Sequence, residues 1–211
     1  MDVLVPYDTR DPKTRLGPFL TAAERRSLAR AMLTDVLDSL SRVGVEPTVL
    51  ATEAVEAGVP VRVDDRPLTP AVNAAIAGRD GPVAVVMADL GLATPAALER
   101  LLTAEGGVVL APGLGGGTNA LLARHPEFRV DYHGVSYRDH RAAARAVGAA
   151  VTTVDSFRLA VDVDDPADLA EVLVHGDGET ATHLRTLGVE VTTDGGRVAV
   201  TRSAEKSGET G

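Results

Sequence analysis

The sequence has no cysteine, and only two of its 21 basic residues, Lys13 and Lys206, are lysines. The lack of cysteine excludes disulfides, thiolate metal sites and a cysteine nucleophile, so any metal must be held by oxygen or imidazole ligands, which favours Mg²⁺ over zinc. No apolar stretch is long enough to span a bilayer, and the first residues lack the basic and long apolar regions of a signal peptide. We therefore expect a cytoplasmic protein without a membrane partner.

The formal net charge is -9, with 30 acidic residues. Binding to a phosphate backbone needs clustered cations, so we expect no polymeric nucleic acid as a partner. An acidic, lysine-poor surface stays solvated in strong salt, which favours a halophilic source. GC-rich codon usage, which replaces lysine by arginine, explains the same bias, and the composition leaves both explanations open.

The length of 211 residues and the 45% hydrophobic content suffice for one domain. Strand-like and helix-like segments alternate, which predicts an α/β layered fold with a mainly parallel sheet flanked by helices. Two alternating runs around Asp194-Gly195-Gly196 predict a C-terminal hairpin. We predict one domain over residues 1–202 and a disordered polar tail over 203–211.

Capping and proline signals place most of the helices. Thr21 with Glu24 is typical of a capping box, and Thr94-Pro95 is typical of a helix start. Helices are predicted at 21–44, 69–78, from 94 onward, and at 118–124, 136–147, 165–173 and 180–187. Strands are predicted at 3–5, 48–51, 59–63, 83–87, 108–111, 157–161, 189–193 and 197–201.

Three aspartates follow predicted strands. Asp89 closes the apolar run at 83–87, and Asp162 and Asp164 follow the run at 157–161. Ligands of open α/β sheets gather at the carboxyl ends of strands, so these carboxylates are candidate ligands of one or two Mg²⁺ ions. The alternative is structural: Asp89 then caps a turn, and Asp164 with Asp165 caps the next helix.

The loop Gly115-Gly116-Gly117-Thr118-Asn119 precedes the helix predicted at 118–124. Backbone N–H groups without side-chain bulk then face an anion at the positive end of that helix. The loop matches neither common phosphate-binding glycine motif, so a tight turn is the alternative. Thr118 and Asn119 either bond a ligand or cap the helix.

Lys13 and Arg15 lie in the loop after the first strand. A lysine retained in so lysine-poor a chain, next to an arginine, favours phosphate binding, although an exposed surface role is the usual one for lysine. The five histidines show no metal-ligand spacing, and we interpret them as surface or packing residues.

Several short motifs follow one another along almost the whole chain. They are Asp11-Pro12-Lys13-Thr14-Arg15-Leu16, Met87-Ala88-Asp89-Leu90, Gly116-Gly117-Thr118-Asn119-Ala120-Leu121, Ser136 with His140, Asp162-Val163-Asp164-Asp165-Pro166-Ala167-Asp168-Leu169 and His175-Gly176-Asp177-Gly178. This ordered set resembles the archaeal 2-phospho-L-lactate guanylyltransferase family.

The resemblance implies a single Rossmann-like nucleotidyltransferase domain of the glycosyltransferase-A-like type, with a C-terminal helix and β-hairpin. It implies an enzyme that joins GTP to 2-phospho-L-lactate and gives lactyl-2-diphospho-5'-guanosine and pyrophosphate, in biosynthesis of the deazaflavin coenzyme F-420. A homodimer is implied by the resemblance alone.

The resemblance also assigns roles to the candidate residues. Asp89 and Lys13 are the catalytic residues. The remaining assignments are Asp89, Asp162 and Asp164 to Mg²⁺, Lys13, Arg15 and Asn73 to GTP, and Gly117, Thr118, Asn119 and Ser136 to the phosphoacid.

Other functions remain open at this point. Some relatives use phosphoenolpyruvate or another small phosphoacid, and the sequence does not decide between GTP and ATP. Molybdopterin and sugar-phosphate nucleotidyltransferases usually carry glycines after the first strand, and Tyr7 to Pro12 contain none. A non-catalytic nucleotide-binding regulator is disfavoured because all three candidate metal carboxylates are present.

Overall fold

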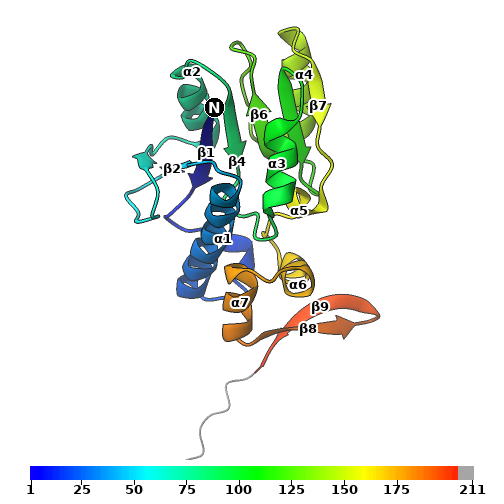
Figure 1. The fold of residues 1–211 in the computed structure, drawn as a ribbon. Coiled ribbons are helices and arrows are strands. Elements are labelled where there is room, and N and C mark those ends of the chain that lie inside the picture. Colours follow the sequence, from blue (N-terminus) through cyan, green and yellow to red (C-terminus); the bar gives the residue numbers. More distant parts are fainter. Residues whose placement is uncertain (204–211) are drawn as a thin grey trace, which may run out of the picture.

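The structure, a computed structural model, describes residues 1–203, which contain one seven-stranded sheet in the order β3-β2-β1-β4-β6-β5-β7 (Figure 1). Its strands are β1 (Asp2–Tyr7), β2 (Thr48–Ala51), β3 (Val61–Val63), β4 (Val83–Val86), β5 (Val108–Pro112), β6 (Thr118–Ala123) and β7 (Val151–Thr153). The helices are η1 (Thr14–Leu16), α1 (Ala22–Arg42), α2 (Leu68–Ala77), α3 (Pro95–Thr103), α4 (Ser136–Ala146), α5 (Phe157–Ala160), α6 (Pro166–His175) and α7 (Glu179–Thr186). Strands β8 (Val189–Asp194) and β9 (Arg197–Arg202) form the C-terminal hairpin. The predicted fold class is confirmed.

Strand β6 runs antiparallel to both of its neighbours, β4 and β5, whereas the other strand pairs of this sheet are parallel. The helix predicted at 118–124 is therefore wrong. All residues of β6 are buried, and a short apolar run buried on both faces has no period that distinguishes a strand from a buried helix. Its Leu and Ala residues favour a helix locally, but hydrogen-bonded strands on both sides override that preference.

The strand predicted at 157–161 is also wrong, because this segment forms the short helix α5. The carbonyl of Ser156 accepts the N–H groups of Leu159 and Ala160, both at 2.9–3.0 Å. Asp162 consequently follows a helical turn rather than a strand end. In contrast, the caps at Thr21 and Thr94 form as predicted, since each hydroxyl accepts a backbone N–H three residues later.

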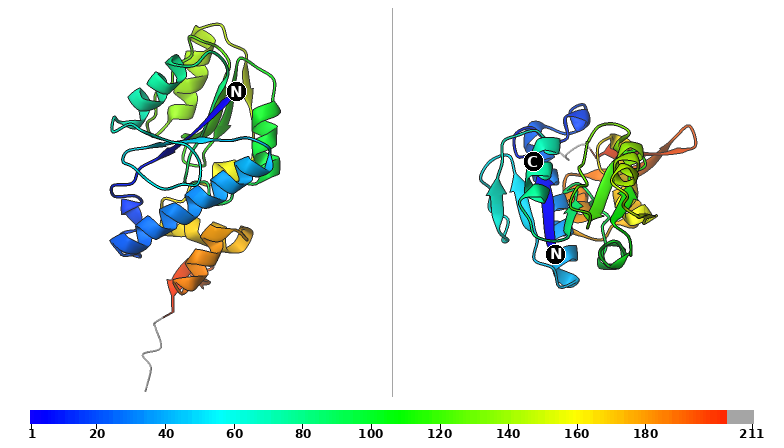
Figure 2. Two further views of the ribbon diagram at one scale, coloured as in Figure 1. Left: turned by 60° about the vertical axis from the view of Figure 1, so that its left-hand side comes forward. Right: turned by 90° about the horizontal axis from the view of Figure 1, so that it is seen from above.

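Helices cover both faces of the sheet. Helices α1 and α3 pack on one face with Val3 and Val5, and α2 and α4 pack on the other with Leu4. Figure 2 shows α2 and α4 on one side of the strands and α3 on the other. Successive residues of β1 thus enter opposite layers, as the period of two in a strand requires.

The segment after α5 forms a third apolar cluster, which α6, α7 and the hairpin build against the N-terminal half of α1. In Figure 1 this part lies at the carboxyl end of β1, below the sheet. Asp35 of α1 fixes it, because its carboxylate accepts the N–H groups of Glu179 and Thr180 at 2.7 and 2.8 Å and the Thr180 hydroxyl at 2.6 Å. The α7 start is therefore capped from a different helix.

The tail predicted over 203–211 lies almost wholly outside the described residues. Ser203 is described, and its N–H donates to the Gly188 carbonyl at 2.9 Å. Over residues 1–203, every helix is too short or too polar to cross a membrane.

Candidate functional site

Three segments meet at one edge of the sheet. Strands β1 and β4 are parallel neighbours, so the loops that carry Lys13 and Asp89 leave the sheet at the same edge. Strand β6 is antiparallel and enters there, with the Asn119 carbonyl accepting the Met87 N–H at 3.0 Å. A cavity of about 500 Å³ lies at this edge. The predicted site residues that line it are Arg15, Asp89, Gly117, Thr118, Asn119, Ser136, Asp162 and Asp164.

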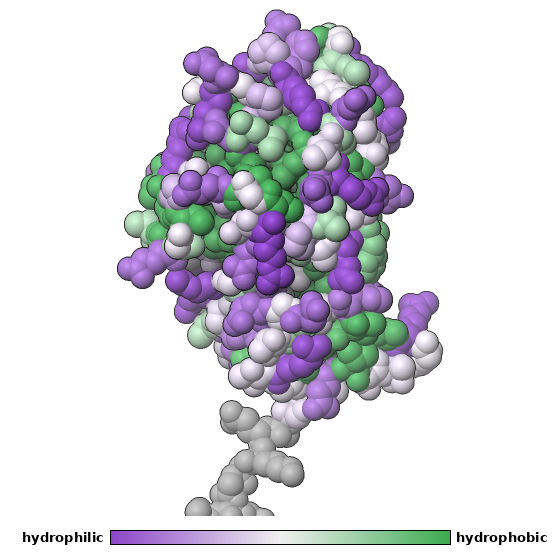
Figure 3. All heavy atoms as spheres, in the orientation of Figure 1, coloured by the Kyte–Doolittle hydropathy of each residue, from purple (hydrophilic) through white to green (hydrophobic). Residues whose placement is uncertain are grey.

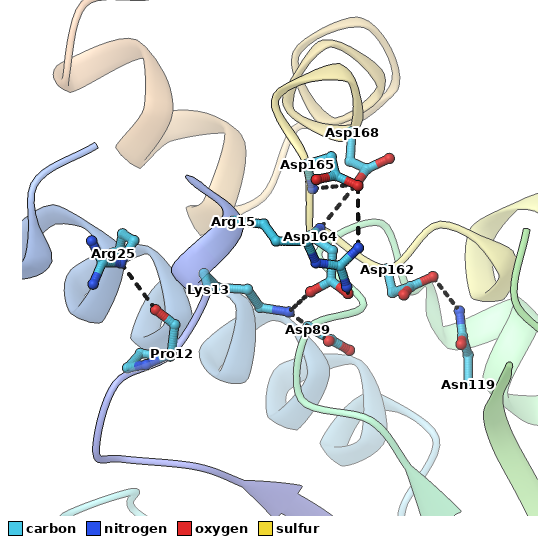
Figure 4. Close-up of polar contacts among 10 residues, drawn as sticks. All are labelled: Pro12, Lys13, Arg15, Arg25, Asp89, Asn119, Asp162, Asp164, Asp165 and Asp168. Carbon is cyan, nitrogen blue, oxygen red and sulfur yellow. Dashed lines mark hydrogen bonds and ion pairs between the residues drawn. The ribbon is translucent and has the colours of Figure 1, made fainter. Parts of the chain in front are cut away.

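Lys13 joins two of the predicted metal ligands. Its Nζ donates to Asp89 Oδ2 at 2.6 Å and to Asp164 Oδ1 at 2.8 Å, with only 10% of the lysine side chain exposed (Figure 4). Arg15 donates to the other oxygen of Asp164 and, at 3.3 Å, to Asp165. Two cations and three carboxylates thus form one network that ties the loop after β1 to the start of α6.

Burial alone lowers the pKa of the Lys13 ammonium, but the adjacent Asp89 and Asp164 carboxylates outweigh it and raise this pKa. The lysine is therefore charged at neutral pH. Its backbone has φ 58°, which makes it the one non-glycine residue with positive φ among residues 1–203. A left-handed lysine costs on the order of 1 kcal/mol, and such strain is typical of functional sites.

Asp162 lines the cavity, is held by Asn119, and lies on the far side of Asp89 and Asp164 from Lys13 in Figure 4. The Asn119 amide donates to Asp162 Oδ1 at 3.1 Å and also contacts the carbonyls of Leu159 and Ala160. Burial and the charges of the neighbouring aspartates raise the pKa of Asp162, although the Asn119 bond partly lowers it. Negative charge is thus crowded around this carboxylate.

The residues present fit a magnesium ion whose coordination is completed by the substrate. Asp89 Oδ1 is buried and has no hydrogen-bond partner within residues 1–203, and Asp162 is crowded by other carboxylates. Mg²⁺ usually keeps one or two protein carboxylates and fills its remaining positions with phosphates and water. In the described part of the chain no three His, Cys, Asp or Glu side chains are arranged to hold a metal. The arrangement therefore suits a partial site rather than a complete protein cage.

The glycine loop is a tight turn between β5 and β6. Because β6 replaces the predicted helix, the anion site expected at that helix N-terminus is wrong. The N–H of Gly113 donates to the Gly117 carbonyl at 2.9 Å, and Gly116 has φ +87°. A Cβ at Gly113 would lie 2.5 Å from Asn119 Oδ1. Asn119 can therefore occupy its position in the site only because Gly113 has no side chain.

Ser136 is the first residue of α4, and its side chain makes no cap hydrogen bond there. Its hydroxyl instead accepts the backbone N–H of Thr118 at 3.1 Å. The Thr118 hydroxyl contacts Nδ1 of His140 at 2.9 Å, and Nε2 of the same ring accepts the N–H of Asp131 at 2.9 Å. His140 is fully buried, and burial lowers its pKa to about 4. The two hydroxyls that line the cavity are thus anchored by α4.

Asn73 is hydrogen-bonded to the backbone of Val130. Its amide donates to the Val130 carbonyl at 2.8 Å and accepts the Val130 N–H at 2.9 Å, so both ends are used by the backbone. Thr69, also on α2, accepts the N–H of Tyr132 at 2.8 Å. Helix α2 therefore holds the segment 130–132, whose Tyr132 lines the cavity, and these contacts give no support to a nucleoside contact by Asn73.

Sequence reasoning missed Met87 and Tyr132. Met87 is shared by the cavity of about 500 Å³ and two smaller cavities of about 220 and 390 Å³ beside β1 and β2. Tyr132 lines the large cavity, and burial raises the pKa of its hydroxyl, which lacks a hydrogen-bond partner among the described residues. The position of Met87, two residues before Asp89, could have indicated that it lies at the site. No local feature of the sequence indicates the same for Tyr132.

The sequence model of the family described as "Guanylyl transferase CofC like" matches residues 1–203. The chain belongs to this family. The chain is 63% identical over 202 residues to the 2-phospho-L-lactate guanylyltransferase of Halomicrobium mukohataei, covering 96% of this chain and 100% of that protein. The protein of the same name from Natronomonas pharaonis is 57% identical over 202 residues, with 96% and 99% covered. The predicted family is confirmed, and family membership makes the chain a nucleotidyltransferase.

Solved structures bear on the fold. A Desulfovibrio desulfuricans protein assigned as a nucleotide-diphospho-sugar transferase superposes with a TM-score of 0.71 at 17% sequence identity, covering 88% of this chain and 95% of that one. At this identity the likeness shows the nucleotidyltransferase-type α/β fold and nothing about the substrate.

Proposed function

We propose that this chain transfers the guanylyl group of GTP to 2-phospho-L-lactate, giving lactyl-2-diphospho-5'-guanosine and pyrophosphate for biosynthesis of the deazaflavin coenzyme F-420. The names of the relatives at 63% and 57% identity support it. The structural observation that carries the proposal is the position of Asp89, which lines two cavities and is bridged by Lys13 to Asp164. A charged centre between two cavities suits a reaction that joins two phosphorylated substrates. The reaction takes place where GTP is available, in the cytoplasm.

GTP is assigned to the cavities beside β1 and β2. The larger of these, about 390 Å³, is lined by Asp8 and Asp64, and both cavities share Tyr7. Arg66 donates to both carboxylate oxygens of Asp64 and is the main reason that the pKa of Asp64 falls to about 2, and the remaining lone pairs of this carboxylate are acceptors. Guanine offers N–H donors along the edge where adenine offers a ring acceptor, and a carboxylate can only accept. This supports GTP over ATP.

The phosphoacid is assigned to the large cavity. Its wall carries the hydroxyls of Thr118 and Ser136, the amide of Asn119 and the backbone of Gly117. Hydroxyls are suitable donors to carboxylate and phosphate oxygens, whereas the Asn119 NH₂ already donates to Asp162 and to the carbonyls of Leu159 and Ala160. Arg15, of which 64% of the side chain is exposed, lies at the same cavity and can follow a mobile phosphate.

In the proposed reaction a phosphate oxygen of the acid attacks the α-phosphorus of GTP in line, and the bond to pyrophosphate breaks. The protein has little covalent chemistry to perform, so it positions the two phosphates and neutralises charge. Lys13 and Arg15 supply fixed positive charge toward the phosphates. Mg²⁺ would be held by one or two of the carboxylates Asp89, Asp162 and Asp164 together with substrate phosphates, and would supply further neutralisation.

The test is release of pyrophosphate from purified protein in high salt with Mg²⁺, each NTP and each candidate phosphoacid. We expect the highest rate with GTP and 2-phospho-L-lactate. A higher rate with phosphoenolpyruvate or with a molybdopterin acceptor would reassign the acceptor. GTP binding without release for any acceptor would support a regulatory protein instead.

Asp89→Asn tests the charged centre in the same assay. We expect turnover to fall by about a hundredfold or more, because charge held in a fixed orientation often contributes more than any other effect to such catalysis. Asp38→Asn, at an exposed position of α1, is the matched control and should leave the rate unchanged. Near-normal turnover of Asp89→Asn would mean that this residue only caps a turn.

A homodimer forms part of the proposal. Figure 3 shows apolar surface in the region of the hairpin and α6. The exposed large apolar side chains of these elements are Val174, Val191 and Val198, with 56%, 43% and 57% exposure. Light scattering after gel filtration at high salt should give twice the chain mass of 21.9 kDa. A monomer mass would remove this part of the proposal.

A further inference from the structure

The hydrogen bonds of His140 define which ring nitrogen carries its proton. The backbone N–H of Asp131 contacts Nε2 at 2.9 Å, and a backbone N–H can only donate. Nε2 is therefore unprotonated, and the proton of the neutral ring is on Nδ1. This Nδ1–H must donate to the Thr118 hydroxyl oxygen, which lies 2.9 Å away.

The same reasoning fixes the direction of the Thr118 hydroxyl proton. Its oxygen accepts from His140, so its own hydrogen must be directed to another acceptor. Thr118 lines the large cavity, with 3% of the residue exposed. Ser136 is in an equivalent state, because its oxygen accepts the Thr118 N–H at 3.1 Å and it lines the same cavity. The oxygens of both hydroxyls thus accept hydrogen bonds from the protein, and their own hydrogens are available to donate to a ligand in the cavity.

We propose that His140 is a positioning residue, which turns the Thr118 hydroxyl into a fixed donor toward the anionic group of the acceptor acid. The inference rests on the proposed function, since it concerns the binding of that acid. His140 does not touch the substrate; it acts through Thr118. A hydroxyl held in this orientation loses little rotational freedom on binding, so its contribution should appear in the affinity for the acid.

A purely structural role must be distinguished from this one, because His140 also holds the wall segment 130–132. That segment has two other attachments, which Asn73 and Thr69 provide. The two nitrogens of His140 therefore serve two separable contacts: Nε2 holds the wall at Asp131, and Nδ1 orients Thr118.

Two substitutions separate the contacts. In His140→Asn the side-chain amide takes the place of Nδ1–H and can donate to Thr118, while the Asp131 N–H loses its acceptor. In His140→Gln the amide carbonyl takes the place of Nε2 and can accept from Asp131, while Thr118 loses its donor. Each variant therefore keeps one of the two contacts and loses the other, and both variants carry the same polar amide group.

The measurement is steady-state kinetics with separate KM values for GTP and the phosphoacid. We expect His140→Gln to raise the KM for the acid by about tenfold to a hundredfold, the usual worth of a hydrogen bond to a charged group, with KM for GTP within about threefold of wild type. His140→Asn should stay within about threefold for both substrates. Equal effects of the two variants, or a larger effect of His140→Asn, would overturn the proposal.

A double-mutant cycle with Thr118→Val adds a second criterion. If His140 acts through Thr118, His140→Gln should raise the KM for the acid no further once the hydroxyl is absent. Fully additive effects would show that His140 acts by another route and would overturn the proposal.

The tautomer of His140 is measured independently of activity, by ¹⁵N chemical shifts of the imidazole ring of the wild-type protein at pH 7. We expect a neutral ring protonated on Nδ1. A ring protonated on Nε2 would overturn the inference even in a fully active enzyme. Absence of turnover in wild type would instead remove the proposed function, so the two failures are distinguishable.

Discussion

The burial of His140 predicts that the free energy of unfolding falls as the pH is lowered from 6.5 toward 4. Burial lowers the pKa of the folded side chain to about 4, although the charges of Asp131 and Asp139 oppose the shift and His133 reinforces it. The ordinary value of 6.5 applies to the unfolded chain. Between these two pKa values the unfolded state binds a proton that the folded state does not bind. The contribution of His140 to the free energy of unfolding is therefore fully present above pH 6.5 and is lost as the pH falls toward 4.

The magnitude follows from the size of the shift. The loss approaches about 1.4 kcal/mol per pH unit midway between these two values and is smaller near each of them, so the free energy of unfolding should fall by about 2 kcal/mol between pH 6.5 and pH 4.5 through His140 alone. Glu24 and Asp64 also lose stabilising charge interactions in acid, but their folded pKa values of about 2 place most of that loss below pH 4.5. Asp162, whose pKa is raised by burial, has the opposite effect on stability as the pH falls, and a comparison with a variant that lacks only the histidine removes its contribution.

The assay is denaturant unfolding at constant high salt, at several pH values from 7 to 4.5, for wild type and His140→Gln. The difference between the two free energies of unfolding cancels the carboxylates and should change by about 2 kcal/mol across the window. His175→Gln, at a histidine whose side chain is 43% exposed, is the control and should follow the wild-type curve. A wild-type minus His140→Gln difference that is independent of pH would refute the reasoning.

Three further predictions follow from single contacts. Gly113→Ala should lower turnover about tenfold or more, because the added Cβ would displace Asn119. Gly115→Ala, with open space around its Cβ, is the control and should fold with wild-type stability. Equal turnover and equal unfolding of the two variants would contradict this prediction. Asp35→Ala should lower the free energy of unfolding by about 1–3 kcal/mol through loss of the α7 cap, and Asp38→Ala by less than about 0.5 kcal/mol, as measured by thermal unfolding. EDTA should stop pyrophosphate release and excess Mg²⁺ should restore it, so undiminished release in EDTA would remove the metal ligands from the proposal.

Local signals in the sequence predicted the elements that local interactions determine. The caps at Thr21 and Thr94 depend on residues three positions apart, and both form. Lys13 and Asp89 each follow a predicted strand, and the parallel pairing of β1 with β4 brings the two loops together. These inferences need only period, capping chemistry and the geometry of a parallel sheet.

The errors occurred where tertiary contacts decide the conformation. Strand β6 is an apolar run that a helix would accommodate equally well, and only its pairing with β4 and β5 makes it a strand. The role of Asn73 was implied by the resemblance and stays a prediction; its contact with Val130, 57 positions away, could not be predicted from any local pattern. The spacing of Ser136 and His140, four residues apart on one helix face, was the available signal for the hydroxyl network.

Helix α1 contributes to two hydrophobic clusters at once. Leu28 and Met32 belong to the cluster with α6, α7 and the hairpin, and Val36 and Leu40 belong to the cluster that covers the sheet. One uninterrupted helix of 21 residues, about 30 Å long, therefore links the two clusters without a hinge. Neither cluster can lose its packing without exposing half of this helix, so the C-terminal part and the sheet should melt in a single cooperative transition, and no cut between them should yield two independently folding pieces.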